Sequence, residues 1–497
     1  MARKPAELNE AARLWTRNQK NRFRALPRPQ RWGFWIAVEA VAIVVIYTID
    51  HSLGVAALVI AAILWLQKID DLRIRLGVEI GLVVLLLIIE PAAGVLVGIG
   101  IALSWVPEKW RVIALPATIG ALAIGYPYFV DDLFTIPLLG PFPDVRTGVV
   151  MLVYIMMALG LNIVVGYAGL LDLGYVAFYA MGAYTVAWFA SLQFSQRTFH
   201  LGAVGIAPNL SGFHISIWIL LALAGIVTAF TGVLIGLPTL RLRGDYLAIV
   251  TLGFGEILPQ VARNGDNFLG SGFNLTNGPN GITPIDSPGF GEHLSNWTGG
   301  ILPANYLTAT HSDRVFYWTA LLLVAITIFS SWRLRDSRLG RAWIAIREDE
   351  TAAAAMGVPL MRTKTWAYAT GAFFGGVAGA YYGSFKSATF PGDFFFNISV
   401  FILCMVILGG MGNIWGVIVG ACFLAYLDQA GLANTGAWLN SNLGLQIDVP
   451  LYEFGIFGVI LLVVMLFRPE GLIPSSRRAA EFHEGVSDEY LYDISKE

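Results

Sequence analysis

Long apolar stretches separated by short polar segments run along most of the chain, from Trp32 to Phe467. Each contains about 14 to 24 residues, and a helix needs about 20 residues to cross the hydrocarbon core of a bilayer. The stretches lack the two-residue alternation that a membrane β-barrel requires, as Leu152–Val165 illustrates. The pattern therefore predicts an all-α integral membrane protein, a polytopic bundle of transmembrane helices.

The placement of charge predicts the topology, because Lys and Arg near the ends of spans favour the cytoplasmic side. The basic N-terminus precedes an apolar run that is followed by Asp50-His51 rather than by a small-residue cleavage site, so we expect an uncleaved first span. With about 14 spans, within a range of about 11 to 15, every basic cluster and both termini are cytoplasmic. The expected spans lie near 33–49, 53–66, 77–89, 92–106, 112–130, 148–164, 172–191, 215–237, 246–262, 315–332, 365–385, 397–409, 414–429 and 452–467.

Composition supports a membrane location. Apolar residues make up 56% of the chain and charged residues 13%, whereas a soluble domain carries about 25% charged residues. The net charge of −2 comes from nearly balanced acids and bases and carries no information about nucleic acid. We expect no nucleic-acid partner. Cys404 and Cys422 both lie within apolar runs, where a small buried side chain is the expected role.

The chain divides into four predicted segments. A basic cytoplasmic N-terminus covers 1–31, and an N-terminal extension of about five transmembrane helices covers 32–146. A glycine-dense membrane domain follows over 147–475, with an outer, periplasmic loop at 264–313 and a cytoplasmic loop at 333–364. The outer loop contains no Lys or Arg. Residues 476–497 form a cytoplasmic tail.

Polar residues and glycines within apolar runs are candidates for a translocation pathway. Asn162 lies inside such a run, and Gly166, Gly169 and Gly174 beyond it permit tight turns with exposed backbone groups. Asp172 lies in the same segment. Two alternatives stay open: Asn162 bonds a neighbouring helix, and Asp172 only caps the next one.

Glu256 places a single carboxylate among apolar residues, with no basic residue within a helical turn. A charge there must be paired, near the interface or in contact with water. We expect Glu256 to face an aqueous cavity on the pathway.

The cytoplasmic loop 333–364 is the most informative segment. Charged residues alternate with apolar ones around Trp343, a helix-forming run follows at Ala352–Ala355, and Gly357 suits a helix C-cap. A short helix held below the membrane is typical of a docking element, the alternative being an ordinary solvated loop.

The outer loop contains the turn-forming cluster Asn277, Gly278, Pro279, Asn280 and Gly281. It is either a plain turn or a contact for an extracytoplasmic partner.

Some catalytic motifs are missing from the sequence. No G-x-x-x-x-G-K-[ST] phosphate loop, H-E-x-x-H, G-x-S-x-G or clustered set of His and Cys occurs. We therefore expect no ATPase activity, no metal site and no cofactor bound by this chain, which is predicted not to be an enzyme.

Over about 147–475 the sequence resembles the permease family of high-affinity branched-chain amino-acid ABC importers, specifically the LivM-type subunit. The five N-terminal spans exceed what that resemblance leads us to expect. The matching segments are Gly160–Gly182, Leu240–Glu256, Gly278–Gly281, Leu339–Trp343, Arg347–Glu350, Val406–Gly412 and Arg468–Leu472.

The resemblance implies a multi-pass subunit of the bacterial inner membrane that works with several partners. These are a second, LivH-type permease, two cytoplasmic subunits that use ATP, a periplasmic substrate-binding protein and membrane lipid. Gly409, Gly410 and Gly412 in the matched turn are assigned to the pathway, and the 277–281 turn to contact with the binding protein.

The resemblance also implies that the segment matching Arg341–Gly357 is a coupling helix that docks on an ATPase subunit. Its general signature is matched loosely, because Thr351 stands where a Glu is expected and Glu350 lies one place earlier. The expected ATPase-coupling residues are Arg341, Trp343, Arg347, Glu348, Asp349, Glu350 and Gly357.

Other functions stay open at this point. Urea, short amides or aromatic acids are alternative substrates of the same kind of importer. An ion-coupled secondary transporter would use intramembrane carboxylates as relays, with Glu39, Glu79 and Glu256 as candidates. A purely structural membrane scaffold is disfavoured by the glycine-dense domain and the predicted docking helix.

Overall fold

The computed structural model describes Val59, Ala61 and residues 72–474, except 134, 137–138, 204–209, 241–244, 271, 289–312 and 445. The predicted N-terminus 1–31, the first two predicted spans apart from Val59 and Ala61, and the tail 476–497 lie outside the described residues. The chain divides into two compact units. Unit 1 comprises residues 1–120 and 131–142, and unit 2 comprises 121–130 and 143–497.

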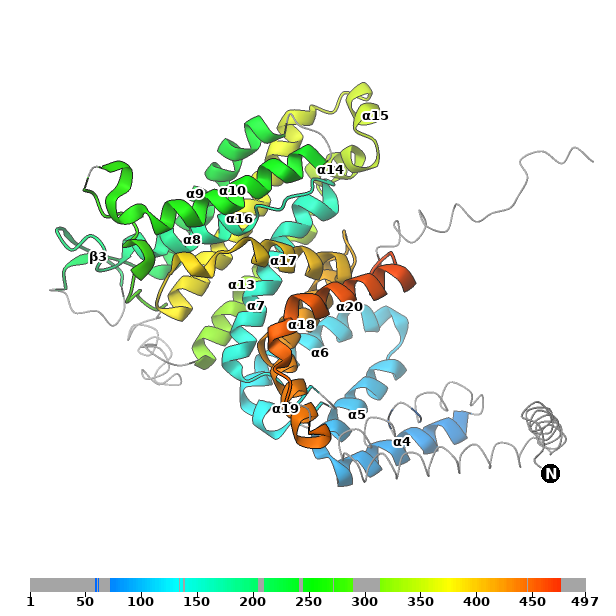
Figure 1. Cartoon of the computed structure of the whole chain (residues 1–497). Coiled ribbons are helices and arrows are strands. Elements are labelled where there is room, and N and C mark those ends of the chain that lie inside the picture. Colours follow the sequence, from blue (N-terminus) through cyan, green and yellow to red (C-terminus); the bar gives the residue numbers. More distant parts are fainter. Residues whose placement is uncertain are drawn as a thin grey trace, which may run out of the picture. The chain divides into compact units, whose positions relative to one another are not determined.

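Unit 1 contains α4 (Leu72–Ile89), α5 (Pro91–Trp105) and the first part of α6 (Glu108–Phe129), drawn in shades of blue in Figure 1. Pro91 occupies the first turn of α5, where its missing N–H costs nothing. Glu79 is buried and accepts a hydrogen bond from Trp105 Nε1 at 2.8 Å. This carboxylate is therefore held by a donor inside unit 1.

Unit 2 is built almost entirely from helices (Figure 1). Its α-helices after α6 are α7 (Val145–Leu161), α8 (Val176–Phe189), α9 (Ile217–Thr239), α10 (Asp245–Arg263), α13 (Asp313–Arg335), α14 (Arg338–Glu348), α15 (Glu350–Ala355), α16 (Leu360–Lys386), α17 (Phe396–Gly409), α18 (Ile414–Tyr426), α19 (Leu432–Leu443) and α20 (Glu453–Phe467). Two π-helices, η2 (Asn162–Tyr167) and η6 (Leu427–Gly431), extend α7 and α18. The 3₁₀ turns of unit 2 are η3 (Gly265–Gly270), η4 (Gly278–Asn280), η5 (Pro391–Asp393) and η7 (Val449–Tyr452), and η1 (Val130–Asp132) is divided between the two units.

Helix α16 is the centre of unit 2 and packs against α7, α8 and α9. Glycines make this close approach possible, because a Cβ at Gly182 would collide with the carbonyl oxygen of Gly376, and one at Gly379 with that of Tyr179. Backbones that touch in this way gain van der Waals contact where lipid offers no hydrophobic driving force. The glycine density seen in the sequence therefore marks helix packing.

A small sheet lies at one end of unit 2. It consists of β1 (Ala190–Ser191), β2 (Thr198–Leu201) and β3 (Gly212–Ile215), in the order β1-β3-β2. Strand β3 pairs antiparallel with β1 and parallel with β2. The all-α prediction missed this sheet, because two- to four-residue strands inside a loop leave no period long enough to recognise.

Two ends of unit 2 can be defined along α16. Helices α14 and α15 precede its first residue, and its last residues bond to the segment beside the sheet, as Ser384 Oγ does to Asp286 O at 2.7 Å. We call these the α15 end and the sheet end; Figure 1 shows α15 and β3 on opposite sides of α16.

Seven helices among the described residues are long and apolar enough to cross a membrane, so the chain is a polytopic helical membrane protein. They are Lys109–Asp132, Val145–Tyr167, Ile217–Thr239, Asp313–Arg335, Pro391–Gly409, Ile414–Asn442 and Val449–Phe467, and three shorter apolar helices are Gly77–Ile89, Pro91–Trp105 and Val176–Phe189. The predicted spans near 246–262 and 365–385 form α10 and α16, which are absent from this set. The expected total of about 14 spans stays a prediction.

Candidate functional site

The predicted helix of the 333–364 loop is present as two short helices, α14 and α15. Ser337 Oγ caps α14 by accepting from Gly340 N at 3.1 Å, and Asp349 Oδ1 caps α15 by accepting from Thr351 N at 2.7 Å and Ala352 N at 2.9 Å. Gly357 follows the C-cap with φ +88°, so the predicted C-cap glycine is confirmed. Side-chain caps at Ser337 and Asp349 therefore determine where α14 and α15 begin.

Gly357 has no atom within 4 Å of the position that a Cβ would take, so only backbone strain opposes a side chain there. We expect Gly357→Ala to destabilise the end of α15 by about 1 kcal/mol, because an L-residue resists positive φ. Amide hydrogen exchange of residues 350–356 should then become about fivefold faster.

Gly444→Ala is the matched control, because Gly444 has φ +65°, equally open space and lies at the end of α19. Unchanged exchange at 350–356 in the Gly357 variant would contradict this account of the cap.

Two of the predicted ATPase-coupling residues face the protein itself. Trp343 is fully buried and its Nε1 donates to Thr363 O at 2.8 Å, and Glu350 forms an ion pair with Lys364 at 2.8 Å. Both partners belong to the first turns of α16. These side chains attach α14 and α15 to the bundle, and neither Trp343 nor Lys364 offers surface to a partner.

The loop exposes several residues of α14 and, most strongly, its tip after α15. Arg341, Glu348, Asp349 and Gly357 are exposed, and so are Ala354 and Ala355. Between them Met356 is 86% exposed, more than any other large apolar side chain in the described part of the chain. Sequence reasoning missed Met356, although its position between a helix-forming run and a C-cap glycine was a usable signal.

Arg347 also points into the protein. Its Nη1 donates to Gly166 O at 2.5 Å, across 181 positions of sequence. A Cβ at Gly169 would lie 2.8 Å from Arg347 Cγ, and one at Gly412 would lie 3.3 Å from Arg347 Nη1. In addition, Asn162 Oδ1 accepts from Gly412 N at 2.9 Å. Three predicted segments therefore meet at this side chain: the loop helix α14, the 160–174 segment and the α17–α18 turn.

The other predicted pathway residues are largely enclosed. Asn162 and Asp172 have no exposed surface, and Asp172 Oδ1 accepts from Gly174 N at 2.9 Å. Asn162 thus bonds the turn between two neighbouring helices. Asp172 does not cap the next helix as the alternative expected, because the N-cap of α8 is Tyr175 and has no side-chain cap. Further glycines fill close contacts, because a Cβ would collide with Thr251 O at Gly174, with Gly416 O at Gly409 and with Ile473 O at Gly410.

Glu256 differs from these residues because it is exposed. Helix α10 buries one face, where Thr251 Oγ1 accepts from Leu173 N at 3.1 Å and Gly255 packs on Gly174. The opposite face presents Glu256 and Gln260, and nothing lies within 4 Å of a Cβ placed at Gly253. Glu256, Gln260 and Gly253 therefore form an open, partly polar stripe along α10, a helix whose other residues are mostly apolar.

The turn at 277–281 is anchored to the sheet end of unit 2. Asn277 adopts φ +60°, its Nδ2 donates to Gly281 O at 2.8 Å, and Ile282 pairs with Thr389. Gly278 is buried, whereas Pro279 and Asn280 are exposed. The predicted contact turn is thus held by hydrogen bonds and has two exposed residues.

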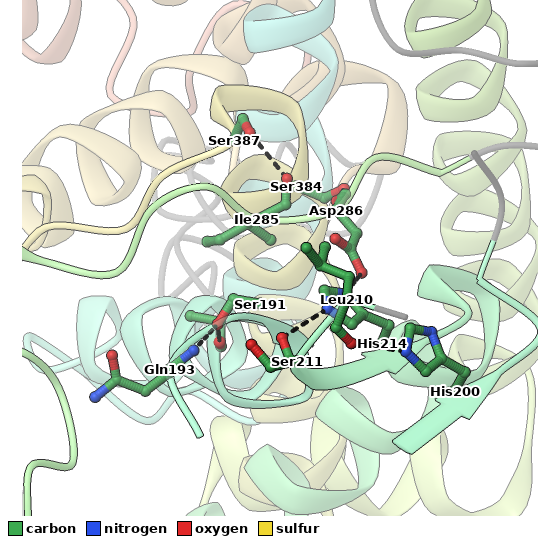
Figure 2. Close-up of polar contacts among 11 residues, drawn as sticks. Ser191, Gln193, His200, Leu210, Ser211, His214, Ile285, Asp286, Ser384 and Ser387 are labelled. Atoms are coloured by element: carbon green, nitrogen blue, oxygen red, sulfur yellow. Dashed lines mark hydrogen bonds and ion pairs between the residues drawn. The ribbon is translucent and has the colours of Figure 1, made fainter. Parts of the chain in front are cut away.

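Beside that turn, a polar cluster ties the chain near residue 286 to the sheet (Figure 2). His214 Nδ1 lies 2.9 Å from Asp286 Oδ2, and the rings of His200 and His214 stack with centroids 5.0 Å apart. Ser387 Oγ donates to Ile285 O at 2.8 Å. Burial raises the pKa of the Asp286 carboxyl above its usual value, and the hydrogen bond to His214 opposes that shift.

Comparison with known proteins adds an independent finding. Residues 145–466 match the family described as the permease component of branched-chain amino acid transport systems. The chain is 37% identical over 383 residues to the high-affinity branched-chain amino acid transport system permease protein LivM of Salmonella typhimurium, covering 75% of this chain and 80% of that protein. It is 36% identical over 392 residues to LivM of Escherichia coli, covering 77% and 79%.

The alignment with LivM covers 75% of the chain and is therefore longer than residues 147–497. It begins before residue 147, within the end of the predicted N-terminal extension.

A second, shorter likeness is to the permease protein LivH of Salmonella typhimurium, with 27% identity over 171 residues, 34% of this chain and 50% of that protein. No solved structure matches the chain.

Proposed function

The chain belongs to the family of permease components of branched-chain amino acid transport systems, and on this basis we propose how it carries its substrate across the bacterial inner membrane. It is a permease subunit of a branched-chain amino acid ABC importer and not an enzyme. In our proposal both termini are cytoplasmic, the α15 end faces the cytoplasm and the sheet end faces the periplasm. The cluster of basic residues between 333 and 364 supports this orientation.

The proposed assembly contains a LivH-type permease beside this chain, two cytoplasmic ATP-binding subunits and a periplasmic binding protein. Likeness to both LivM and LivH supports the pairing with a second permease. ATP is used by the partner subunits, since this sequence has no phosphate loop.

The observation that carries the coupling part of the proposal is the exposed tip of α15. Met356 is 86% exposed among small neighbours, in a loop that charge places outside the membrane. Such an apolar side chain fits a hydrophobic groove on a partner. The ion pair between Glu350 and Lys364 connects α15 to α16, so a displacement of α15 can reach the bundle. We therefore assign Met356 and Gly357 to the contact with an ATP-binding subunit, with Arg341, Glu348 and Asp349 at its rim.

For the pathway we propose the open stripe of α10. A carboxylate facing lipid is costly, so Glu256 and Gln260 are better placed along a polar passage at the boundary with the second permease. The substrate is a zwitterion, and the Glu256 carboxylate can attract its ammonium group. The buried residues Asn162, Asp172 and the neighbouring glycines then shape the helices behind this passage.

On the periplasmic side we propose Pro279 and Asn280 as the part of the turn that meets the binding protein. Both residues are exposed. The backbone beside them packs closely at Gly281, where a Cβ would collide with Thr389 O and the Phe390 ring. A preorganised turn loses little freedom when a partner docks on it.

ATP binding would draw the two ATP-binding subunits together and displace α15 and α14. The helices attached to them would then tilt, so that the passage opens to one side at a time. Such a shift requires ligands that bind the two states with different affinity, a role that falls to nucleotide and to the loaded binding protein.

The substrate assignment is tested by uptake of radiolabelled leucine and urea in cells that lack the gene, with and without a plasmid copy. We expect leucine uptake to be lost in the deletion strain and restored by the intact copy, with urea uptake unchanged, because the branched-chain relatives share over a third of the aligned residues.

Loss and restoration of urea uptake, with leucine uptake unchanged, would replace the proposed substrate by the urea alternative. A strain in which neither solute depends on the gene would contradict the amino-acid assignment.

A further inference from the structure

The side chain of Arg347 contacts the protein's own backbone, although the loop that carries it is the proposed docking element. It lies in the last turn of α14, yet its side chain turns away from the exposed tip and its guanidinium reaches the carbonyl oxygen of Gly166 at 2.5 Å. Gly166 is the penultimate residue of the π-helix that ends α7. A cation at the C-terminal end of a helix interacts favourably with the free carbonyl groups and with the helix dipole.

The surroundings of Arg347 are shaped to hold this side chain. Gly169 and Gly412 come from two separate segments, both have positive φ, at +67° and +86°, and both present their α-carbons to Arg347. A Cβ at Gly169 would approach Arg347 Cγ to 2.8 Å. The guanidinium and its aliphatic stem are thus contacted by two glycine turns.

These two turns are also joined to each other. Asn162 Oδ1, at the start of the same π-helix, accepts from Gly412 N at 2.9 Å. Gly412 lies in the turn between α17 and α18. Displacement of Arg347 would therefore move both the end of α7 and the α17–α18 turn.

We propose that Arg347 is a positioning residue that transmits the movement of α14 and α15 to the ends of α7, α17 and α18. This inference rests on the proposed function, in which α15 is displaced by an ATP-binding subunit. It gives Arg347 a role inside the permease, between the docking tip and the transmembrane helices. Helices α7, α17 and α18 extend from this point along unit 2, so a shift here changes their tilt.

The test uses the whole complex, purified and reconstituted in vesicles, and measures three quantities. They are the amount of ATP-binding subunit that co-purifies, the ATPase rate stimulated by the leucine-loaded binding protein, and the leucine transported per ATP hydrolysed. Arg347→Met keeps an unbranched stem for the glycine turns and removes the hydrogen bond. We expect it to retain the ATP-binding subunits and to lower leucine transported per ATP about tenfold, in line with the loss of a charge-assisted hydrogen bond.

Arg347→Lys preserves the charge, so it should restore part of the transport per ATP. Arg338→Met is the matched control, because Arg338 is an exposed arginine on the same helix and has no part in the proposed contacts. This control variant should leave the leucine transported per ATP hydrolysed unchanged. Thermal unfolding of each complex distinguishes loss of coupling from loss of fold, and Arg347→Lys carries the test if the methionine variant does not accumulate.

Two results would overturn the inference. Wild-type transport per ATP in both Arg347 variants would show that the contact transmits nothing, and loss of the ATP-binding subunits from Arg347→Met would make Arg347 a docking residue. Failure of the proposed function is seen separately, because then the wild-type complex itself would not couple ATP to leucine uptake.

Discussion

Replacement of Met356 by glutamate is expected to release the ATP-binding subunits and to reduce leucine uptake to the level of cells without the gene. The side chain is 86% exposed at the tip of α15, between Ala355 and Gly357, and nothing in unit 2 covers it among the described residues. In the proposed contact a glutamate would be buried without a partner. The cost of several kcal/mol corresponds to more than a hundredfold loss of affinity.

Co-purification of the ATP-binding subunits with tagged permease measures this effect, together with leucine uptake in the deletion strain. Met356→Leu is the control, since it keeps apolar volume and should bind and transport nearly as the wild type does. A glutamate variant that retains its ATP-binding subunits would contradict the assignment of α15 as the docking element.

Glu256→Gln is expected to lower leucine uptake about 10- to 100-fold while the ATP-binding subunits stay attached. This range corresponds to the loss of one hydrogen bond between charged groups. Glu256 is exposed on the open stripe of α10, far in sequence from the docking loop. Removal of its charge should therefore change passage of a zwitterion without altering assembly.

Asp448→Asn is a matched control, because Asp448 is an exposed carboxylate directly before η7, outside both the proposed passage and the docking contact. Uptake that stays at the wild-type level in Glu256→Gln would remove Glu256 from the pathway. Loss of uptake together with loss of the partner subunits would instead place Glu256 at an assembly contact.

Features that depend on neighbouring residues could be predicted from the sequence. The apolar runs predicted membrane helices, and Ala352–Ala355 followed by Gly357 predicted a short helix with its C-cap. Both depend on interactions within a few residues, which composition and spacing reveal.

The direction of a side chain could not be predicted in the same way. Trp343 and Arg347 were expected to contact an ATPase subunit, but their partners are Thr363 O and Gly166 O, the latter 181 positions away. Spacing along α14 gives the helical face of each residue, and only the packing of other helices decides which face is buried.

Polar residues in apolar runs posed a related problem. Asn162 and Glu256 both indicated a pathway, because a polar group at membrane depth needs either a partner or water. In the structure Asn162 bonds Gly412 N and is fully buried, whereas Glu256 is exposed. A buried polar residue with a partner and an exposed polar residue give the same sequence pattern, so only the three-dimensional structure distinguishes them.

In the proposed function this chain forms an ATP-driven passage for branched-chain amino acids. The decisive experiment follows accumulation of leucine in vesicles that contain this chain, its LivH-type partner and the ATP-binding subunits, with binding protein outside and ATP inside. We expect accumulation that requires both ATP and this chain and that persists when ionophores collapse the ion gradients. Accumulation without ATP, or its abolition by ionophores while ATP remains, would contradict the proposal in favour of ion-coupled transport.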